Sequence, residues 1–152
     1  YPHKLVYHGV NMDSQIILDV MTSNHEKILS LLHAFKEQVG QDFSSAEKIL
    51  DSLKWEIERH FFLEERAVFV MVNPKSQFYD MVQKIMKEHK NMLQMFKKVE
   101  EELSRKEEPD ITELEKTLKE HAEFEESIFY EELDQELSDV EKKIIVERIR
   151  SF

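Results

Sequence analysis

The chain has very few of the residues that break helices. Its 152 residues include only 2 glycines and 3 prolines, and Gly40, Pro74 and Pro109 all fall between long segments. Within those segments apolar residues recur at steps of three and four, which is the period of an α-helix with one buried face. No segment shows the alternation that is typical of a strand. The sequence therefore predicts an all-α protein with few, long helices.

Capping and helix-breaking residues indicate where the helices begin and end. We expect long helices over residues 13–39, 44–71, 76–106 and 110–133, and a short fifth helix from residue 138. Ser44–Glu47 and Ser138–Glu141 have the pattern of capping boxes. Residues 1–12 have no helical period and are expected to form an extended N-terminal arm. Four long helices with short loops predict an up-down-up-down four-helix bundle, one domain over residues 13–152.

The composition excludes several classes of function. Charged residues make up 35% of the chain and the formal net charge is −11, which disfavours binding to nucleic acid or to an anionic membrane surface. No run of apolar residues is long enough to span a bilayer. The absence of cysteine excludes disulfides and thiolate metal sites and fits a reducing compartment. We therefore expect a soluble, cytoplasmic protein.

Each of the four long segments carries one histidine on its apolar stripe. These histidines are His25, His60, His89 and His121. Two of them are followed four residues later, on the same helix face, by Glu64 and Glu125, and Ile128 continues the stripe of the fourth segment. Taken alone, each could be a packed core histidine or a carboxylate at the edge of the stripe. Taken together they would be very costly to bury without a cation, because an unpaired buried carboxylate costs several kcal/mol.

The positions of the histidines along the bundle support this interpretation. Two residues of an antiparallel helix pair lie at one level when they are equidistant from the turn. The midpoint of His25 and His60 falls between residues 42 and 43, inside the first predicted turn. The midpoint of the second-helix pair and His89 falls near residue 75, and that of His89 and the fourth-helix pair at residue 106. All four histidines are therefore expected in one layer, to within about one helical turn.

The ligand types indicate which metals could bind. Imidazole with carboxylate suits iron, manganese or zinc. Six ligands are too many for a single tetrahedral zinc ion. A carboxylate from each of two helices, directed into a bundle core, is the arrangement of dinuclear carboxylate-bridged sites. The predicted site therefore holds two ions, each with two histidines, bridged by two glutamates.

The residues around these positions resemble a known family. The segments that carry the resemblance are His25, His60–Glu65, Glu88–Lys90 and His121–Glu126. Over about residues 13–135 the chain is similar to the hemerythrin-like (HHE cation-binding) domain family. The resemblance implies a non-haem centre of two iron ions, oxo- or hydroxo-bridged, with manganese or zinc as possible replacements. It implies that His25 and His60 ligate one iron, His89 and His121 the other, and that Glu64 and Glu125 bridge them.

The pattern departs from that of the oxygen-carrying hemerythrins. Those proteins have two histidines four residues apart on the third helix, where this chain has Ile85 and Leu93 flanking His89. Their fourth-helix carboxylate comes five residues after the histidine, whereas Glu125 comes four after and Glu126 five. The set of four histidines and two glutamates is closer to the iron-centre repair proteins of the superfamily, which are linked to nitric-oxide stress. Those proteins also carry a cysteine-bearing N-terminal domain, and this chain has no cysteine.

The expected function is the binding of dioxygen, nitric oxide or peroxide at the two metals. The alternatives are an enzyme that reduces nitric oxide or peroxide or oxidises a substrate, an iron- or oxygen-sensing module, and a metal-free structural bundle. Four further positions are not placed among the ligands. His33 is expected at the edge of the stripe or on the surface, and Glu65, Glu88 and Glu126 in solvent, with Glu126 as the candidate replacement ligand.

Overall fold

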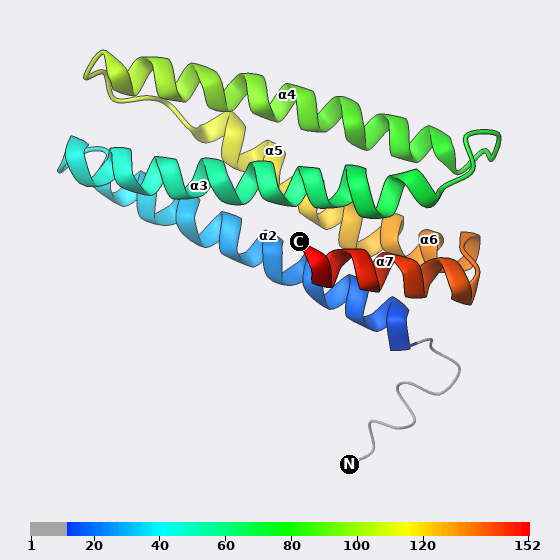
Figure 1. Ribbon diagram of the computed structural model, residues 1–152. Helices are drawn as coiled ribbons and strands as arrows, with labels where there is room; N and C mark the ends of the chain where they lie inside the picture. Colours follow the sequence, from blue (N-terminus) through cyan, green and yellow to red (C-terminus); the bar gives the residue numbers. More distant parts are fainter. Residues whose placement is uncertain (1–11) are drawn as a thin grey trace.

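The computed structural model describes residues 12–152, and every regular element in them is a helix. The α-helices are α2 (Met12–Gln38), α3 (Phe43–Leu63), α4 (Tyr79–Ser104), α5 (Thr112–Phe124), α6 (Tyr130–Glu136) and α7 (Asp139–Ser151). Figure 1 shows α2, α3, α4 and the continuous α5–α6 run lying lengthwise beside one another, with consecutive runs in opposite directions, and α7 alongside α2. The predicted all-α bundle is confirmed. The predicted arm lies outside the described residues except for Met12, which is the first residue of α2.

Two of the helical runs contain a π-helical turn at corresponding places. These turns are η1 (Glu64–Val68), which a short 3-10 turn η2 (Phe69–Met71) follows, and η3 (Glu125–Phe129), which joins α5 to α6. A π turn inserts one residue and therefore shifts the buried face by one position. The predicted stripe is wrong within η3 for this reason, because Ile128 is 43% exposed and Phe129 is fully buried.

The starts of α3 and α4 differ from the expected ones, and α5 begins at Thr112 rather than at residue 110. Asp42 caps α3, since its side chain accepts hydrogen bonds from the backbone N–H groups of Ser44 and Ser45 at 3.0 and 3.4 Å. The predicted capping box at Ser44–Glu47 is therefore wrong. The α4 helix begins at Tyr79 rather than at Ser76, because residues 74–78 form turns in which the Ser76 hydroxyl accepts a bond from the Phe78 N–H. The predicted capping box that opens α7 is confirmed.

The apolar core is divided into two clusters by the layer that contains the four histidines. One cluster includes Ile28, Leu32, Phe35, Leu53, Phe96 and Leu118, and the other includes Met21, Ala67, Val68, Val82, Ile85, Phe129 and Ile145. In each helical run the histidine falls between residues of one cluster and residues of the other. The polar layer is therefore closed at both ends by packed hydrocarbon, which removes water from it and strengthens electrostatic interactions inside it.

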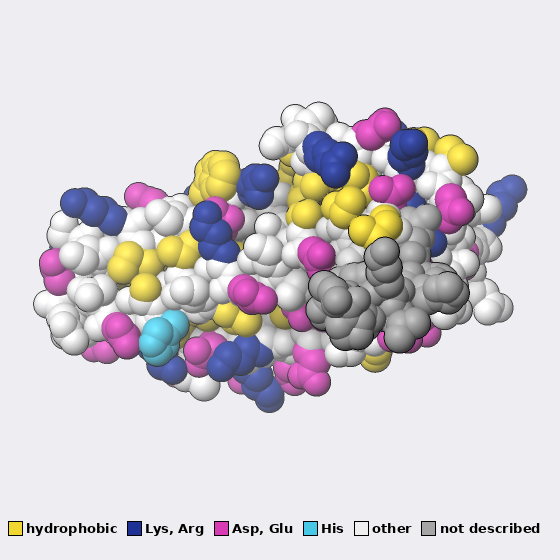
Figure 2. Space-filling model, turned by 90° about the horizontal axis from the view of Figure 1, so that it is seen from below, with side chains coloured by type: hydrophobic (Ala, Val, Ile, Leu, Met, Phe, Trp, Pro, Cys, Tyr) yellow, Lys and Arg dark blue, Asp and Glu magenta, His cyan; other side chains and the backbone are white. Residues whose placement is uncertain are grey.

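The surface carries side chains of both charges. Figure 2 shows acidic and basic side chains interspersed over the face seen from below, with hydrophobic side chains gathered towards the end of the molecule where α7 lies. Large hydrophobic side chains that are exposed include Trp55, Phe62 and Phe152. No helix within residues 12–152 has the length and hydropathy needed to cross a membrane.

The end of α4 offers a test of local backbone strain. Lys106 has φ 61°, and the bonds from its N–H to the Leu103 carbonyl and from the Glu107 N–H to the Glu102 carbonyl form a Schellman cap. Lysine is strained in this left-handed conformation and glycine is not. We expect Lys106→Gly to raise the free energy of unfolding by about 0.5–1 kcal/mol in urea titrations. The matched control Lys97→Gly, in the exposed interior of α4, should lower it by about 1 kcal/mol, and destabilisation by both would contradict the strain.

Candidate metal centre

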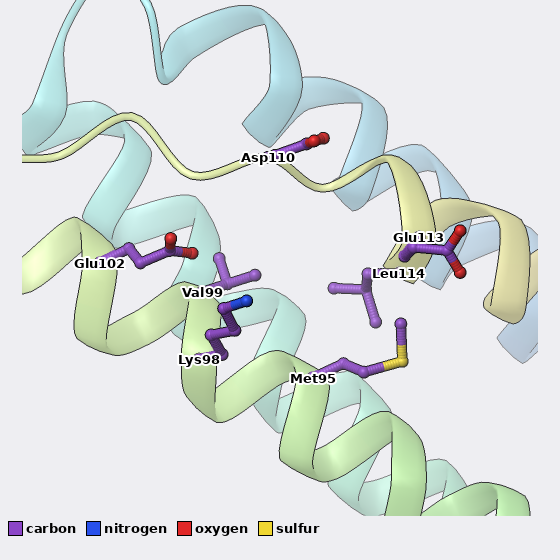
Figure 3. Close-up of a pocket in the computed structure, with 7 residues that line it drawn as sticks. All are labelled: Met95, Lys98, Val99, Glu102, Asp110, Glu113 and Leu114. Atoms are coloured by element: carbon purple, nitrogen blue, oxygen red, sulfur yellow. The ribbon is translucent and has the colours of Figure 1, made fainter.

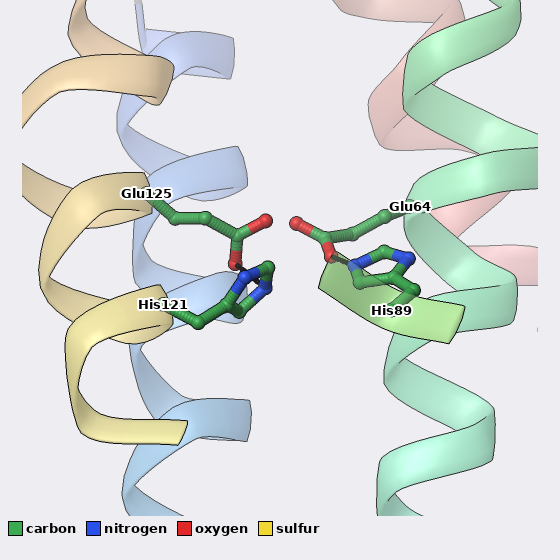
Figure 4. A group of neighbouring side chains, drawn as sticks. All are labelled: Glu64, His89, His121 and Glu125. Atoms are coloured by element: carbon green, nitrogen blue, oxygen red, sulfur yellow. Dashed lines mark hydrogen bonds and ion pairs between the residues drawn. The ribbon is translucent and has the colours of Figure 1, made fainter. Parts of the chain in front are cut away.

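The structure brings all six predicted residues together in the core. Figure 4 shows Glu64 and His89 on one side and His121 and Glu125 on the other, with their side chains pointing towards one another. The six side chains are contributed by α2, α3, η1, α4, α5 and η3, and all six are buried. Glu64 and Glu125 have no exposed surface. Such burial of ionisable groups requires compensation by opposite charge or by a cation.

The Nε2 atoms of the four histidines face the two carboxylates. Glu125 Oε1 lies 2.7 Å from Nε2 of His25, 3.5 Å from that of His60 and 3.3 Å from that of His121. Glu64 Oε1 lies 3.0 Å from Nε2 of His89 and 3.3 Å from that of His60. Each carboxylate thus reaches histidines on both sides of the layer, as a bridging ligand must.

The potential ligand atoms form two overlapping groups. The side chains of His25, His60 and Glu125 form the first group, hereafter position 1. The side chains of Glu64, His89, His121 and Glu125 form the second, hereafter position 2. Within each group the ligand atoms lie within 4.8 Å of one another, and Glu125 belongs to both. The geometry can therefore accommodate two neighbouring cations that share a carboxylate.

The Nδ1 atoms of the histidines have partners on the outer side of the layer. Glu126, Glu65 and Glu88 lie 2.7, 2.8 and 2.8 Å from Nδ1 of His25, His89 and His121 respectively. These three carboxylates were expected in solvent, and that expectation is wrong, since each is partly exposed but holds a buried imidazole. Each directly neighbours a buried site residue in the chain, but this position alone does not distinguish a partner of a histidine from a solvated glutamate.

These outer partners determine which nitrogen of each ring can bind a metal. A carboxylate accepts the proton of Nδ1, so the lone pair of a neutral imidazole is left on Nε2 and points into the layer. His60 is the exception, because its Nδ1 lies 3.0 Å from the side-chain amide nitrogen (Nδ2) of Asn24. An amide can present either its oxygen or its nitrogen, and only the oxygen would accept the Nδ1 proton and leave Nε2 free.

In the metal-free protein, protonated histidines offset the negative charge of Glu125. Burial lowers the pKa of His121, but the charge of Glu125 and hydrogen bonds to Glu125 and Glu88 outweigh this and raise it to about 10. Burial likewise lowers the pKa values of His25 and His89, and their carboxylate partners raise both above the usual value. Burial raises the pKa of Glu125, but hydrogen bonds from its neighbours and the charge of His121 hold it well below its usual range.

Protons do not satisfy the site completely. Among the buried polar atoms of residues 12–152, His60 Nε2, His121 Nε2 and Glu125 Oε2 have no hydrogen-bond partner. Buried polar atoms are rarely left without a partner in folded proteins. All three atoms are ligand types of one metal layer, and cations placed there would contact each of them. The donor set of imidazole nitrogens and carboxylate oxygens therefore fits iron, manganese or zinc.

Tyr130 is a further residue of the site that sequence reasoning missed. Its hydroxyl donates a 2.6 Å hydrogen bond to Glu64 Oε2, and burial together with the charges of Glu64 and Glu125 raises its pKa well above the usual value. In an α-helix, residues five apart lie about 140° apart around the axis. The π turn η3, in which the Tyr130 N–H bonds to the Glu125 carbonyl, returns Tyr130 to the face of Glu125.

The two halves of the site are related by an approximate internal repeat, which the sequence analysis also missed. Residues 60–69, HFFLEERAVF, match residues 121–130, HAEFEESIFY, at the histidine, at both glutamates and at the final aromatic ring. Asn24 and His25 correspond in the same way to Glu88 and His89. The repeat is visible only when the few site positions are compared, because the remaining residues differ.

One small cavity adjoins the histidine layer, and a larger hollow lies away from it. A cavity of about 10 Å³, roughly the size of one water, adjoins His25, His60 and His121, and its other lining residues are Ile28, Leu29, Phe61, Leu118 and Ala122. A larger hollow of about 230 Å³ lies between α4 and the start of α5 and contains no histidine. Figure 3 shows its carboxylates spread around the rim.

His33 is exposed and pairs with Glu37, as expected for a surface residue.

Comparison with known proteins identifies the family. The model of the hemerythrin HHE cation-binding domain matches residues 16–133, which include all six buried ligand-type residues. No curated protein and no solved structure matches the chain. The matched segment covers most of the chain and agrees with a helical bundle whose core holds a buried histidine and glutamate cluster. The chain therefore belongs to the hemerythrin HHE cation-binding domain family.

Proposed function

We propose that the protein is a non-haem di-iron protein that binds dioxygen, nitric oxide or peroxide at its metal layer. His25 and His60 would ligate one iron, His89 and His121 the other, and Glu64 and Glu125 would bridge them. One observation carries the proposal: four Nε2 atoms converge on two fully buried carboxylates, with three of these ligand atoms unpartnered. When bound, the irons would supply redox chemistry and an open coordination position.

The protein's own residues support binding of a small molecule. The outer partners orient the imidazoles, and the two apolar clusters exclude water from the layer. The cavity beside His25, His60 and His121 has room for a molecule of a few atoms only. At the spacing where oxygen carriers have a further histidine, Ile85 is buried in the apolar core and Leu93 is partly exposed, and neither can ligate a metal. Exogenous ligands would therefore find an unfilled position.

The test is metal analysis of protein purified without a histidine tag and reconstituted anaerobically with ferrous iron. We expect about two irons per chain, binding of azide or nitric oxide, and oxidation of the diferrous form in air within minutes. Less than one ion per chain would refute the proposal. An oxygen adduct that is stable for hours and reversed by degassing would indicate an oxygen carrier instead, and continuous turnover of nitric oxide or peroxide would indicate an enzyme.

The role of Glu126 distinguishes an outer partner from a ligand. Because Glu126 contacts Nδ1 of His25 rather than the inner carboxylates, Glu126→Ala should weaken metal binding by about 10–100-fold and still allow both ions to bind at saturation. Isothermal titration with Fe²⁺ or Co²⁺ measures both quantities. Glu123→Ala, an exposed change on α5, is the matched control and should have no effect. Loss of a whole ion in the Glu126 variant would show that Glu126 is itself a ligand.

A further inference from the structure

The two halves of the metal layer are related by the internal repeat, and the repeat is broken at two places. Asn24 stands where the other half has Glu88, and Phe69 stands where the other half has Tyr130. The remaining site positions are paired identically, with Glu65 matching Glu126 as outer partners. Differences between the two metal positions must therefore arise mainly from these substitutions.

The first break changes the charge of the side chains that contact the Nδ1 atoms of the histidines. At position 2 both imidazoles have carboxylate partners, Glu65 on His89 and Glu88 on His121. At position 1 His25 has the carboxylate of Glu126, but His60 has only the neutral amide of Asn24. A carboxylate partner fixes the tautomer and raises the basicity of a ligating histidine more than an amide does. The ligands of position 2 are therefore the stronger pair.

The second break changes how the carboxylates are held. The Tyr130 hydroxyl occupies Oε2 of Glu64, so that Oε1 is directed towards His89 and His60. Phe69, at the matching position, has no hydroxyl, and Oε2 of Glu125 has no hydrogen-bond partner among the described residues. Glu64 is thus pre-oriented before any ion binds, and it is one of the four side chains grouped at position 2, whereas Glu125 is the carboxylate grouped with His25 and His60.

Both breaks favour tighter metal binding at position 2 than at position 1. Position 2 has four convergent side chains and position 1 has three. We propose that the two positions differ in affinity, so that position 2 fills first and holds its ion tightly, whereas the ion at position 1 is exchangeable. The inference rests on the proposed function. It implies that a chain with a single ion carries it between His89 and His121. The exchangeable ion would then be the one held by His25 and His60, which line the small cavity together with His121.

Stepwise titration of the metal-free protein with Co²⁺ under anaerobic conditions tests this proposal, with visible absorption and calorimetry as readouts. We expect two steps separated by at least about tenfold in dissociation constant. Asn24→Asp, which gives His60 a carboxylate partner, should tighten only the weaker step, by about tenfold. Glu88→Gln, which gives His121 an amide, should weaken only the tighter step by a similar factor. The control Asn91→Asp adds the same charge on the exposed face of α4 and should shift neither step.

Tyr130→Phe tests the second break, because it makes position 130 match Phe69. It should weaken the tighter step more than the weaker one, whereas Tyr79→Phe, which removes a hydroxyl on α4, should change neither. Thermal unfolding followed by circular dichroism establishes that each metal-free variant is folded. The proposal is overturned if the wild-type protein binds two ions in one indistinguishable step, or if Glu88→Gln weakens the weaker step. A wild-type protein that binds no Co²⁺ and no Fe²⁺ would instead refute the proposed function.

Discussion

Replacement of Glu125 by alanine is expected to leave less than about one metal ion per chain, the largest effect of any single change in the site. Glu125 is the only side chain that belongs to both groups of potential ligand atoms in the described residues, and its Oε1 lies within 3.5 Å of three histidine Nε2 atoms. Its loss therefore removes a ligand from each ion, and it also removes the negative charge that attracts both ions to neighbouring positions. Glu64→Ala should also abolish the dinuclear site, because Glu64 reaches His60 and His89.

Metal content after anaerobic reconstitution and desalting measures the effect. Glu125→Gln, which keeps the shape and removes the charge, should show the same loss and so separates ligation from packing. His33→Ala is the control within the same protein, because His33 is an exposed histidine that pairs with Glu37, and it should keep the full complement of ions. Retention of both ions with an unchanged spectrum in either Glu125 variant would contradict the bridging role.

The sequence was sufficient to predict the helical bundle and the convergence of the six buried residues. Both predictions depend on the 3.6-residue period and on distances along the chain from the turns, which are properties of backbone geometry that side-chain detail does not alter. His25, His60, His89 and His121 lie in one layer because each helix runs continuously from its turn to its histidine.

The π turns limited what the sequence could show. A π turn forms where packing of the core favours an i→i+5 backbone hydrogen bond, and no local residue pattern predicts it. Within η3 the predicted stripe was therefore displaced by one residue, from Phe129 to Ile128, and Tyr130 was not recognised as part of the site. The outer partners were missed for a different reason. Glu65, Glu88 and Glu126 lie at the edge of the stripe, where a partly exposed glutamate in an acidic chain is indistinguishable by pattern from a solvated one.

The stability of the metal-free protein should depend strongly on pH, with a maximum between about pH 4.5 and 6.5. The folded pKa of His121, about 10, lies above its value of 6.5 in the unfolded chain. The stabilisation from this group is therefore complete below pH 6.5 and is lost as the pH rises towards 10, by about 1.4 kcal/mol per pH unit. His25 and His89 act in the same direction. Glu125, whose pKa is lowered, stabilises the fold above about pH 4.5 and ceases to do so as the pH falls further.

Metal binding should reverse the alkaline part of this dependence. Ligating imidazoles must be neutral, so each ion displaces protons that the metal-free layer holds above pH 6.5. Affinity should rise about tenfold per pH unit for each proton released, and the increase in melting temperature on adding metal should be larger at pH 9 than at pH 6.5. Calorimetric titration in two buffers with different ionisation enthalpies counts the protons released. If no protons were released at pH 7.5, or if the melting temperature of the metal-free protein did not change between pH 7 and 9, then protonated histidines do not neutralise Glu125, and the charge balance of the layer would have to come from elsewhere.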